Sequence, residues 1–381
     1  MTDRVDYAIV GGGPAGLAVA ILAAMDGRSA VVIEREHGPV DKACGEGLMP
    51  PGVAWLSRMG VEIGTDDKHL FRGIRYVDGD VVAEADFVEG PGMGIRRVAL
   101  WAAMLARAEA LGVEVRRTCT AGDFTLHADR VVLQTSRGTI ESRWMVGADG
   151  LHGHVRKACG FAVATGPRRR FGLRRHYRLA PWSDLVEVHW TDGVEAYVTP
   201  VGPDRVGIAF LWSSAGGQRG DYDGFLARFP KLLARLGPAA ASPETAVRGG
   251  GPFDVRVHPV ARGRVLLVGD ASGYLDAITG EGLSLAFASA AALVEATSGP
   301  DASVYPRAWE RIRRRHIEAT RFVLWMADRP WLRRRILRAL RSRPDAFAAL
   351  LALSTGARGW MRALPGAAKI GLRLVLDARL N

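Results

Sequence analysis

The apolar and polar positions near the N-terminus predict a strand, a helix and a second strand, in that order. An apolar run over residues 7–10 predicts the first strand, and an Ala- and Leu-rich segment from residue 17 predicts the helix. A second apolar run over residues 30–33 predicts the next strand. Two parallel strands joined by a helix form a βαβ unit, so the chain opens as an α/β protein.

Later segments add a second sheet and further helices. Helical spacing of apolar residues after Arg97 predicts a helix that Gly112 ends, and the repeated alternation across residues 171–212 predicts an antiparallel sheet with one covered face. The remaining predicted elements are a short strand over 113–115, a hairpin of 130–135 with 139–146, a buried strand over 264–268 and a helix over 281–296.

These elements predict an α/β fold, α+β overall, in which a mostly antiparallel β domain is inserted into a Rossmann-like nucleotide-binding domain. The discontinuous nucleotide-binding domain is predicted to comprise residues 1–60, 90–165 and 255–300. The inserted domain, expected to bind the substrate, is predicted to comprise residues 61–89 and 166–254, and a helical C-terminal region to comprise residues 301–381.

The C-terminal region carries amphipathic helices rich in arginine. Apolar residues recur at helical spacing over 308–327 and 332–340, and shorter helices are predicted over 347–353 and 370–376. Residues 301–381 hold 18 Lys and Arg against 6 Asp and Glu, a net charge of +12, whereas the whole chain carries +11. Either these helices cap the body with their arginines facing solvent, or they dock reversibly on an anionic membrane.

Composition favours a cytoplasmic protein without a metal site. The chain has 381 residues, of which 48% are hydrophobic and 24% charged, as in globular enzymes. It shows neither a secretory leader nor an apolar run of about 18 residues. Its three cysteines lack metal-ligand spacing and fit a reducing compartment. We therefore expect a cytoplasmic protein, membrane-peripheral if the C-terminal region docks, with no nucleic-acid partner. The oligomeric state stays open.

The turn after the first predicted strand indicates a phosphate-binding site. Gly11 makes a tight turn, Gly13 lets a pyrophosphate approach the backbone, and Gly16 lets the helix pack close to the strand. Pro14 and Ala15 begin the helix, whose N-terminal N–H groups and dipole attract anions. These five residues are predicted to contact a dinucleotide.

An acidic residue closes the predicted βαβ unit. Glu34 follows the second strand about 20 residues after the glycines, where a carboxylate binds ribose hydroxyls. Its neighbour Arg35 is predicted to contact the same cofactor. Because strand, glycines, helix, strand and acid occur in the required order, the pattern is far more specific than a glycine motif alone.

Four separated blocks together resemble the FAD-binding superfamily that contains aromatic hydroxylases, flavin halogenases and geranylgeranyl reductases. The blocks are Gly11–Gly16 with Glu34, Arg97 with Leu100, Gly147–Gly150 with Val155 and Arg156, and Gly269–Ala271. The resemblance implies FAD as the cofactor. It further implies that Arg97 reaches the flavin phosphate or ribityl chain, that Asp270 accepts hydrogen bonds from ribityl hydroxyls, and that Asp149 supports the cofactor site.

Two segments look most similar to the geranylgeranyl-reductase-like branch. One is Lys42–Leu48, which includes Gly45, and the other runs from residue 269 to residue 283. Gly273 stands where the hydroxylases typically carry histidine, and the Trp-x-Trp-x-Ile-Pro stretch of tryptophan halogenases is absent. The chain departs from the superfamily at Gly153, where serine is usual, and this puts local hydrogen bonding there in doubt.

The start of the predicted helix over 281–296 suits contact with a flavin ring. Gly280 and Gly282 let the backbone approach the flat isoalloxazine, with Leu283 beside it. The positive end of the helix dipole would stabilise the anionic reduced ring.

Cys44 and His176 are candidate functional side chains. The resemblance implies that Cys44 lies beside flavin and substrate, where it positions the substrate or donates a proton. The alternative is an inert buried thiol. His176 lies in an arginine-rich strand that could attract an anionic group of the substrate, but a solvated edge strand is the favoured interpretation.

The resemblance implies an FAD-dependent oxidoreductase acting on a hydrophobic small molecule, isoprenoid- or natural-product-like. We expect NAD(P)H or another donor to reduce the flavin, which then passes a hydride to a C=C bond in a pocket formed by residues 165–255. One alternative is a monooxygenase that hydroxylates or epoxidises through a C4a-hydroperoxide. Another is a non-catalytic flavoprotein that docks on membranes.

Overall fold

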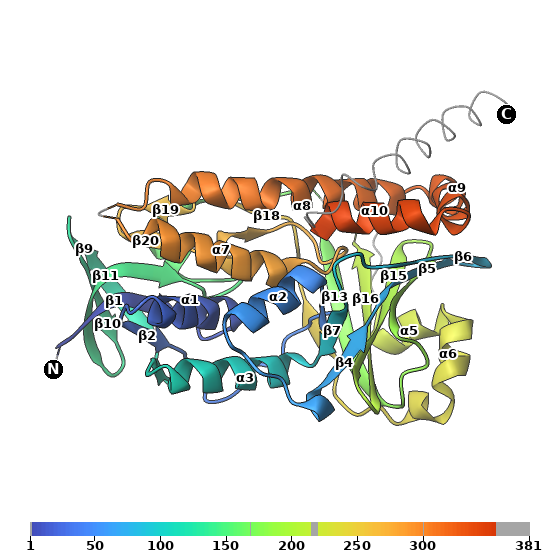
Figure 1. Cartoon of the computed structure of the whole chain (residues 1–381), viewed down its shortest axis with the longest axis horizontal. Coiled ribbons are helices and arrows are strands. Elements are labelled where there is room, and N and C mark those ends of the chain that lie inside the picture. Colours follow the sequence, from blue (N-terminus) through green and yellow to red (C-terminus); the bar gives the residue numbers. More distant parts are fainter. Residues whose placement is uncertain (1, 168, 215–219, 300, 356–381) are drawn as a thin grey trace.

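A mainly parallel sheet forms one end of this computed structural model, which describes residues 2–167, 169–214, 220–299 and 301–355 (Figure 1). Its parallel strands are, in spatial order, β20 (Val265–Leu267), β11 (Gly138–Gly147), β1 (Thr2–Val10), β2 (Ala30–Ile33) and β8 (Glu114–Arg116). The antiparallel additions are β19 (Ala261–Arg262) beside β20, β10 (Val131–Thr135) beside β11, and β9 (Ala121–Leu126) beside β10. The strands predicted at 7–10, 30–33, 113–115, 130–135, 139–146 and 264–268 are therefore present.

Helices stack in layers against this sheet. The helices of this part are α1 (Pro14–Met25), α2 (Pro50–Arg58), α3 (Arg97–Ala110), α4 (Val155–Ala158), α7 (Gly282–Ala296) and α8 (Tyr305–Ala327). Helix α1 contacts both α3 and α7, and α8 runs along α7 (Figure 1). Residues 17–21 of α1 are entirely buried, which its small and aliphatic side chains permit. The glycine turn that precedes α1 is therefore held by a rigid layer.

A seven-stranded sheet forms the other end. Its strands are, in order, β17 (Arg248–Gly250), β13 (Arg170–Arg178), β16 (Arg205–Ser213), β15 (Val194–Gly202), β14 (Leu185–Thr191), β5 (Gly73–Asp78) and β6 (Val81–Asp86). All neighbours are antiparallel except β14 and β5. The antiparallel sheet predicted over 171–212 is thus present, and residues 73–86 extend it.

Both faces of the seven-stranded sheet are covered, so the expectation of a single covered face was wrong. Helices α5 (Tyr222–Ala227) and α6 (Pro230–Leu236) pack on the face that carries Ile208 and Phe210. The opposite face carries Val188 and Leu211, which share an apolar cluster with residues of the C-terminal helices.

Two small sheets connect the ends of the molecule. One contains β3 (Gly47–Leu48), β7 (Gly92–Ile95) and β4 (Lys68–Phe71), and the other contains β12 (Ala162–Thr165), β18 (Val255–His258) and β21 (Gly273–Tyr274). In the described ranges, short 3-10 helices occupy Thr65–Asp67, Gly237–Ala241 and Gly269–Ser272. The division into a nucleotide-binding and a substrate domain stays a prediction.

The C-terminal helices pack on the body. Helix α9 (Pro330–Arg341) and α10 (Pro344–Thr355) lie over β6, and α10 also contacts α8. Arg333 is 1% exposed and pairs with Asp78 of β5, so the expectation that the arginines all face solvent was wrong for this residue. The predicted helix over 370–376 lies outside the described residues. Within the described ranges, no helix has the length and apolar character needed to cross a membrane.

Candidate cofactor and substrate site

One large cavity lies where the two main sheets and the C-terminal helices meet. Its volume is about 1210 Å³, above the roughly 300–1,000 Å³ that is typical of small-molecule pockets. The predicted cofactor residues other than Gly16, together with Cys44, line its wall: Gly11, Gly13, Pro14, Ala15, Glu34, Arg35, Cys44, Gly45, Arg97, Asp149, Asp270, Gly280, Gly282 and Leu283. The structure therefore brings together residues that are spread over more than 270 positions of the sequence.

The glycine turn between β1 and α1 is shaped by close backbone packing. A side chain on Gly16 would lie 2.0 Å from the backbone oxygen of Gly11, so Gly16 lets the helix approach the strand without lining the cavity. Gly11 has φ +110°, a conformation that favours glycine. No atom lies within 4 Å of the position that a side chain on Gly13 would take. The backbone there faces open space, as phosphate binding requires.

Two backbone N–H groups orient the Glu34 carboxylate. Its Oε2 accepts a hydrogen bond from Gly12 N at 2.7 Å, and its Oε1 accepts one from Glu36 N at 2.9 Å. Each carboxylate oxygen has a second lone pair, which is available to hydroxyl donors in the cavity. Trp101 Nε1 donates to Gly12 O at 2.9 Å and fixes the same turn from α3.

Asp270 lies on the cavity wall among cations. Asp270 lines the cavity, and the surrounding protein raises the pKa of its carboxyl by burial. The positive charges of Arg97, Lys42 and Arg313 act in the opposite direction and lower this pKa. Burial also lowers the pKa of Lys42, with Arg97 adding to the effect. The cluster of cations on Arg97, Lys42 and Arg313 suits phosphate groups.

Asp149 uses one carboxylate oxygen for the protein and leaves the other free. Its Oδ2 accepts hydrogen bonds from His154 N at 2.5 Å and Val155 N at 2.9 Å. Its buried Oδ1 has no hydrogen-bond partner among the described residues, although the residue lines the cavity. A side-chain atom on Gly153 would lie 2.2 Å from this oxygen, so the departure from serine accommodates the carboxylate as placed here.

The first turn of α7 forms another part of the wall, and α8 supports it from behind. Gly280 has φ +69°, and Thr279 Oγ1 lies 3.3 Å from Thr320 Oγ1 of α8. Further along α8, Trp309 Nε1 donates to Ser272 Oγ at 3.0 Å, and a guanidinium nitrogen of Arg313 donates to Ser272 O at 3.0 Å. The turn that carries Asp270 is therefore anchored by the C-terminal region.

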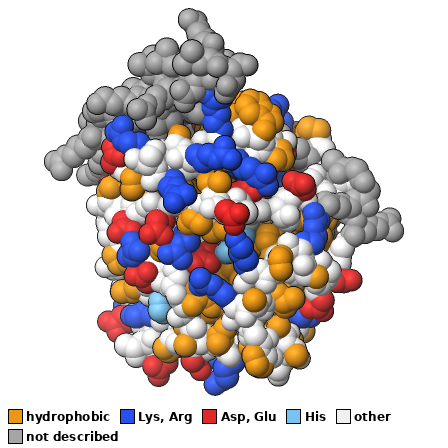
Figure 2. All heavy atoms as spheres, turned by 90° about the vertical axis from the view of Figure 1, so that its right-hand side faces the viewer, with side chains coloured by type: hydrophobic (Ala, Val, Ile, Leu, Met, Phe, Trp, Pro, Cys, Tyr) orange, Lys and Arg blue, Asp and Glu red, His pale blue; other side chains and the backbone are white. Residues whose placement is uncertain are grey.

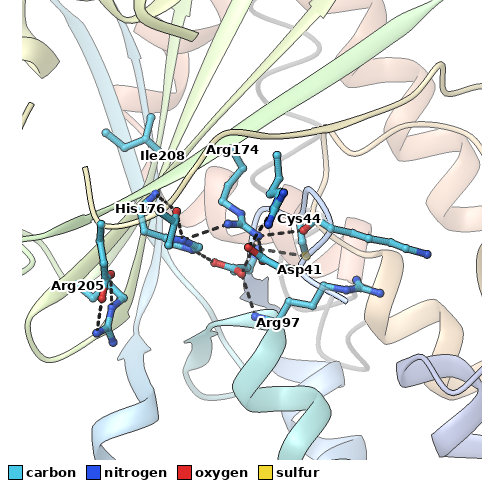
Figure 3. A network of polar contacts seen from close by, with 12 residues as sticks. Asp41, Cys44, Arg97, Arg174, His176, Arg205 and Ile208 are labelled. Atoms are coloured by element: carbon cyan, nitrogen blue, oxygen red, sulfur yellow. Dashed lines mark hydrogen bonds and ion pairs between the residues drawn. The ribbon is translucent and has the colours of Figure 1, made fainter. Parts of the chain in front are cut away.

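Glu46 connects the loop that carries Cys44 to Arg97 and to His176, which Figure 3 labels. Its Oε1 accepts a hydrogen bond from Arg97 N at 2.9 Å, at the start of α3, and His176 Nε2 on β13 lies 2.5 Å from its Oε2. Its own N donates to Cys44 Sγ at 3.4 Å. Glu46 has φ +57° and is 4% exposed. The sequence analysis missed this residue, although an acid between Gly45 and Gly47 was a usable signal.

His176 is buried, so the interpretation as a solvated edge strand was wrong. Its exposed fraction is 0%, and Arg174 Nη1 and Thr245 Oγ1 lie 3.1 Å and 3.0 Å from its Nδ1. Because arginine only donates, Nδ1 must accept, and the ring proton on Nε2 then faces Glu46. Arg174 also donates to Asp41 and to Lys42 O, which ties the loop to β13 (Figure 3).

Cys44 lies on the cavity wall close to this network. Burial raises the pKa of its thiol, with Arg97 acting in the opposite direction. The sulfur is therefore a protonated thiol at neutral pH, able to donate a proton and weak as a nucleophile. Cys119 and Cys159 are buried free thiols; Cys119 also lines the cavity, whereas Cys159 does not.

An apolar arm of the same cavity extends between the seven-stranded sheet and the C-terminal helices. The sheet contributes Tyr76, Val186, Val188, Tyr197 and Leu211, and the helices contribute Val323, Met326, Ile336, Leu340, Phe347 and Leu351. The sequence analysis expected residues 165–255 to form the pocket. It therefore missed the wall that the C-terminal helices contribute. The apolar stripes of α8–α10 were visible in the sequence, but their packing partner was not.

The residues present fit FAD. The glycine turn gives phosphate oxygens access to the backbone, and Glu34 can still accept hydrogen bonds from ribose hydroxyls. Asp149 Oδ1, which has no partner among the described residues, can accept one further hydrogen bond. Fold and cavity together therefore define a dinucleotide-binding protein with its ligand at the carboxyl ends of parallel strands. Residues 4–205 match the family model described as an FAD binding domain. The match covers more than half of the chain, which therefore belongs to this family and is an FAD-dependent oxidoreductase.

Similar proteins carry several activities within this superfamily. The chain is 45% identical to menaquinone reductase of Mycolicibacterium smegmatis, but over 75 residues only, 20% of this chain and 18% of the relative. It is 28% identical to menaquinone reductase of Mycobacterium tuberculosis over 302 residues, 74% of this chain and 73% of the relative. Other relatives are named as geranylgeranyl reductases and monooxygenases.

A solved structure supports the fold. The flavoprotein/dehydrogenase of Cytophaga hutchinsonii superposes with a TM-score of 0.76 and 18% identity, covering 93% of each chain. At this identity the likeness concerns the fold and leaves the reaction to be argued from the site.

Proposed function

We propose that this flavoenzyme reduces a carbon–carbon double bond in a hydrophobic small molecule of isoprenoid or natural-product type. The observation that carries the proposal is the apolar arm, which is continuous with the polar cofactor end in one cavity. An arm lined by aliphatic and aromatic side chains favours an uncharged substrate, because a charge buried there without a partner would be costly. The relatives named as reductases of isoprenoid compounds agree with such a substrate.

Reduction of a double bond requires a hydride on one carbon and a proton on the other. Reduced FAD, when bound, supplies the hydride equivalent, after NAD(P)H or another donor has delivered two electrons. In this proposal the Cys44 thiol supplies the proton, which is supported by its position on the cavity wall and by the burial that keeps it protonated. Arg97 stabilises the thiolate that remains until solvent returns the proton.

The first experiment follows the reduced enzyme without oxygen. We expect an uncharged unsaturated isoprenoid alcohol, geranylgeraniol, to reoxidise the dithionite-reduced flavoprotein under anaerobic conditions, with a product two hydrogen atoms heavier by mass spectrometry. Reoxidation by oxygen alone, with one ¹⁸O atom from ¹⁸O₂ in the product, would contradict the proposal and identify a monooxygenase.

A pair of cysteine variants tests the proton donor. Cys44→Ala should keep FAD bound and lower turnover about 100-fold, the lower end of general-acid effects. Cys159→Ala, which removes a buried thiol that does not line the cavity, should leave turnover within about twofold of the wild type. Unchanged turnover of Cys44→Ala with intact FAD would remove Cys44 from the reaction.

A further inference from the structure

Within the part of the chain that the structure describes, exposed aromatic side chains gather at one corner of the molecule. Among the described residues, the exposed aromatics are Phe322 (45%), Trp325 (42%) and Trp331 (69%). All three lie within ten positions, at the end of α8 and the start of α9. Single exposed apolar residues are ordinary, but such a concentration of large rings marks an interaction surface.

Arginines surround these rings. The rings of Phe322 and Trp325 stack with centroids 6.0 Å apart, and the Arg329 guanidinium lies 5.0 Å from the Trp325 ring centroid. Arg321 is the exposed neighbour of Phe322. We call these residues, with Trp331, the corner patch. Figure 2, which looks onto the end of the molecule that carries α9, shows Lys and Arg side chains gathered with hydrophobic ones along its upper part.

The charge of this corner is strongly positive. Residues 321–341 contain seven arginines and one acidic residue, Asp328. Arg333 and Arg334 pair with Asp78, and the other five arginines still outnumber the single acid. Positive side chains beside exposed tryptophans are the composition of surfaces that bind anionic lipid headgroups with rings at the acyl boundary.

The corner patch lies at an opening of the cavity. Phe322 lines the cavity wall although it is 45% exposed, so it stands at the lip. On the same helix, Val323 and Met326 line the interior of the apolar arm. An apolar path therefore leads from the corner patch into the arm.

We propose that the corner patch docks on an anionic lipid bilayer and that Phe322 marks the entrance through which a hydrophobic substrate passes from the bilayer into the apolar arm. The delivery step rests on the proposed function, whereas docking does not. A second copy of the chain is a poorer occupant, because a symmetric interface would bring like-charged arginines together.

The test uses the full-length, FAD-loaded protein and vesicle sedimentation. We expect binding to vesicles of phosphatidylcholine with phosphatidylglycerol, loss of most binding at high salt, and weak binding to phosphatidylcholine alone. Tryptophan fluorescence should be quenched by brominated lipids, and this quenching should fall in Trp331→Phe.

Two variants separate the apolar and charged contributions. Trp331→Ala should lower vesicle affinity about tenfold through lost apolar burial, and Arg321→Gln about fivefold through one lost charge. The control Arg4→Gln removes another exposed charge, from β1, where the Arg4 side chain is 84% exposed, and should bind as the wild type does. Unchanged FAD content and melting temperature establish that each variant is folded.

Several results would overturn the proposal. They are absence of vesicle binding, binding that Trp331→Ala and Arg321→Gln leave unchanged, and self-association by light scattering that Trp331→Ala abolishes, which would assign the patch to a protein interface. Vesicle binding without double-bond reduction would leave docking intact and refute the proposed function. Reduction of a detergent-dissolved substrate without vesicle binding would leave the proposed function intact and refute docking.

Discussion

Replacing Glu46 by glutamine should weaken both the fold and FAD binding. The side chains of Glu46 and Arg174 are each 2% exposed, and that of His176 is 0% exposed, so water cannot replace the lost contacts. Glu46→Gln removes a charge 3.6 Å from Arg174 and a charge-assisted hydrogen bond to His176. Such bonds contribute about 1.5–3 kcal/mol each, and we expect the free energy of unfolding to fall by about 2–3 kcal/mol.

The effect on the cofactor follows from what Glu46 holds in place. Its carboxylate fixes the backbone of Arg97, and its backbone N contacts Cys44, both on the cavity wall. Displacement of Arg97 should cost one charge-assisted contact to FAD, so the dissociation constant should rise about tenfold. Fluorescence titration of apoprotein with FAD measures the constant, and urea unfolding of the same sample measures stability.

A matched exposed acid provides the control. The Glu114 side chain is 61% exposed and pairs with Arg116. The substitution Glu114→Gln should change the free energy of unfolding by less than about 1 kcal/mol. A double-mutant cycle of Glu46→Gln with His176→Asn should show a coupling of at least about 1 kcal/mol. If Glu46→Gln leaves both unfolding and FAD affinity unchanged, the network does not position the site and the reasoning is refuted.

Three further changes test other parts of the structure. Asp78→Ala should lower the free energy of unfolding by about 3–5 kcal/mol in urea titrations, because it strands the buried Arg333; Arg333→Met should cost less, since Asp78 keeps Arg334. Glu34→Ala should raise the FAD dissociation constant about 10–100-fold in fluorescence titrations and leave the fold intact, and an unchanged constant would remove Glu34 from the ribose site. Burial raises the pKa of Glu281 from 4.5 to about 8, so the folded state binds the proton more tightly than the unfolded chain. The free energy of unfolding of the wild type should therefore decline as the pH rises from 4.5 to about 8. The melting temperature of Glu281→Gln relative to the wild type should increase over the same pH range, and a constant difference between the two proteins would contradict the pKa shift.

Local patterns in the sequence were enough to predict most elements and the cofactor end of the cavity. The turn around Gly11 and Gly13 needs residues without side chains, and the helix after Arg97 has regular apolar spacing. Each feature depends on residues that are close in the sequence, so a local pattern predicts it. The turn follows β1 of the parallel sheet, whereas Arg97 follows β7 of a small antiparallel sheet, so their meeting on one wall depends on tertiary packing that local patterns do not record.

The apolar arm and the Glu46 network could not be predicted, because they depend on contacts between distant positions. Arg333 and Asp78 are 255 positions apart, and His176 and Glu46 are 130 apart. An amphipathic stripe shows that a helix buries one face but not which surface it covers. His176 was misjudged for the same reason, since alternation along a strand does not reveal whether both faces are covered.

Helix α8 has a consequence for selectivity among substrates of different length. The helix touches the cofactor end through Arg313 and the cavity lip through Phe322, nine positions later. At 1.5 Å per residue this separation is about 14 Å, and it is fixed because a helix is rigid along its axis. Under the double-bond reduction proposed above, this fixed separation sets how far a substrate chain must reach before its reacting bond meets the cofactor. Substrates that differ only beyond that distance should react alike, whereas moving the double bond along the chain should abolish turnover.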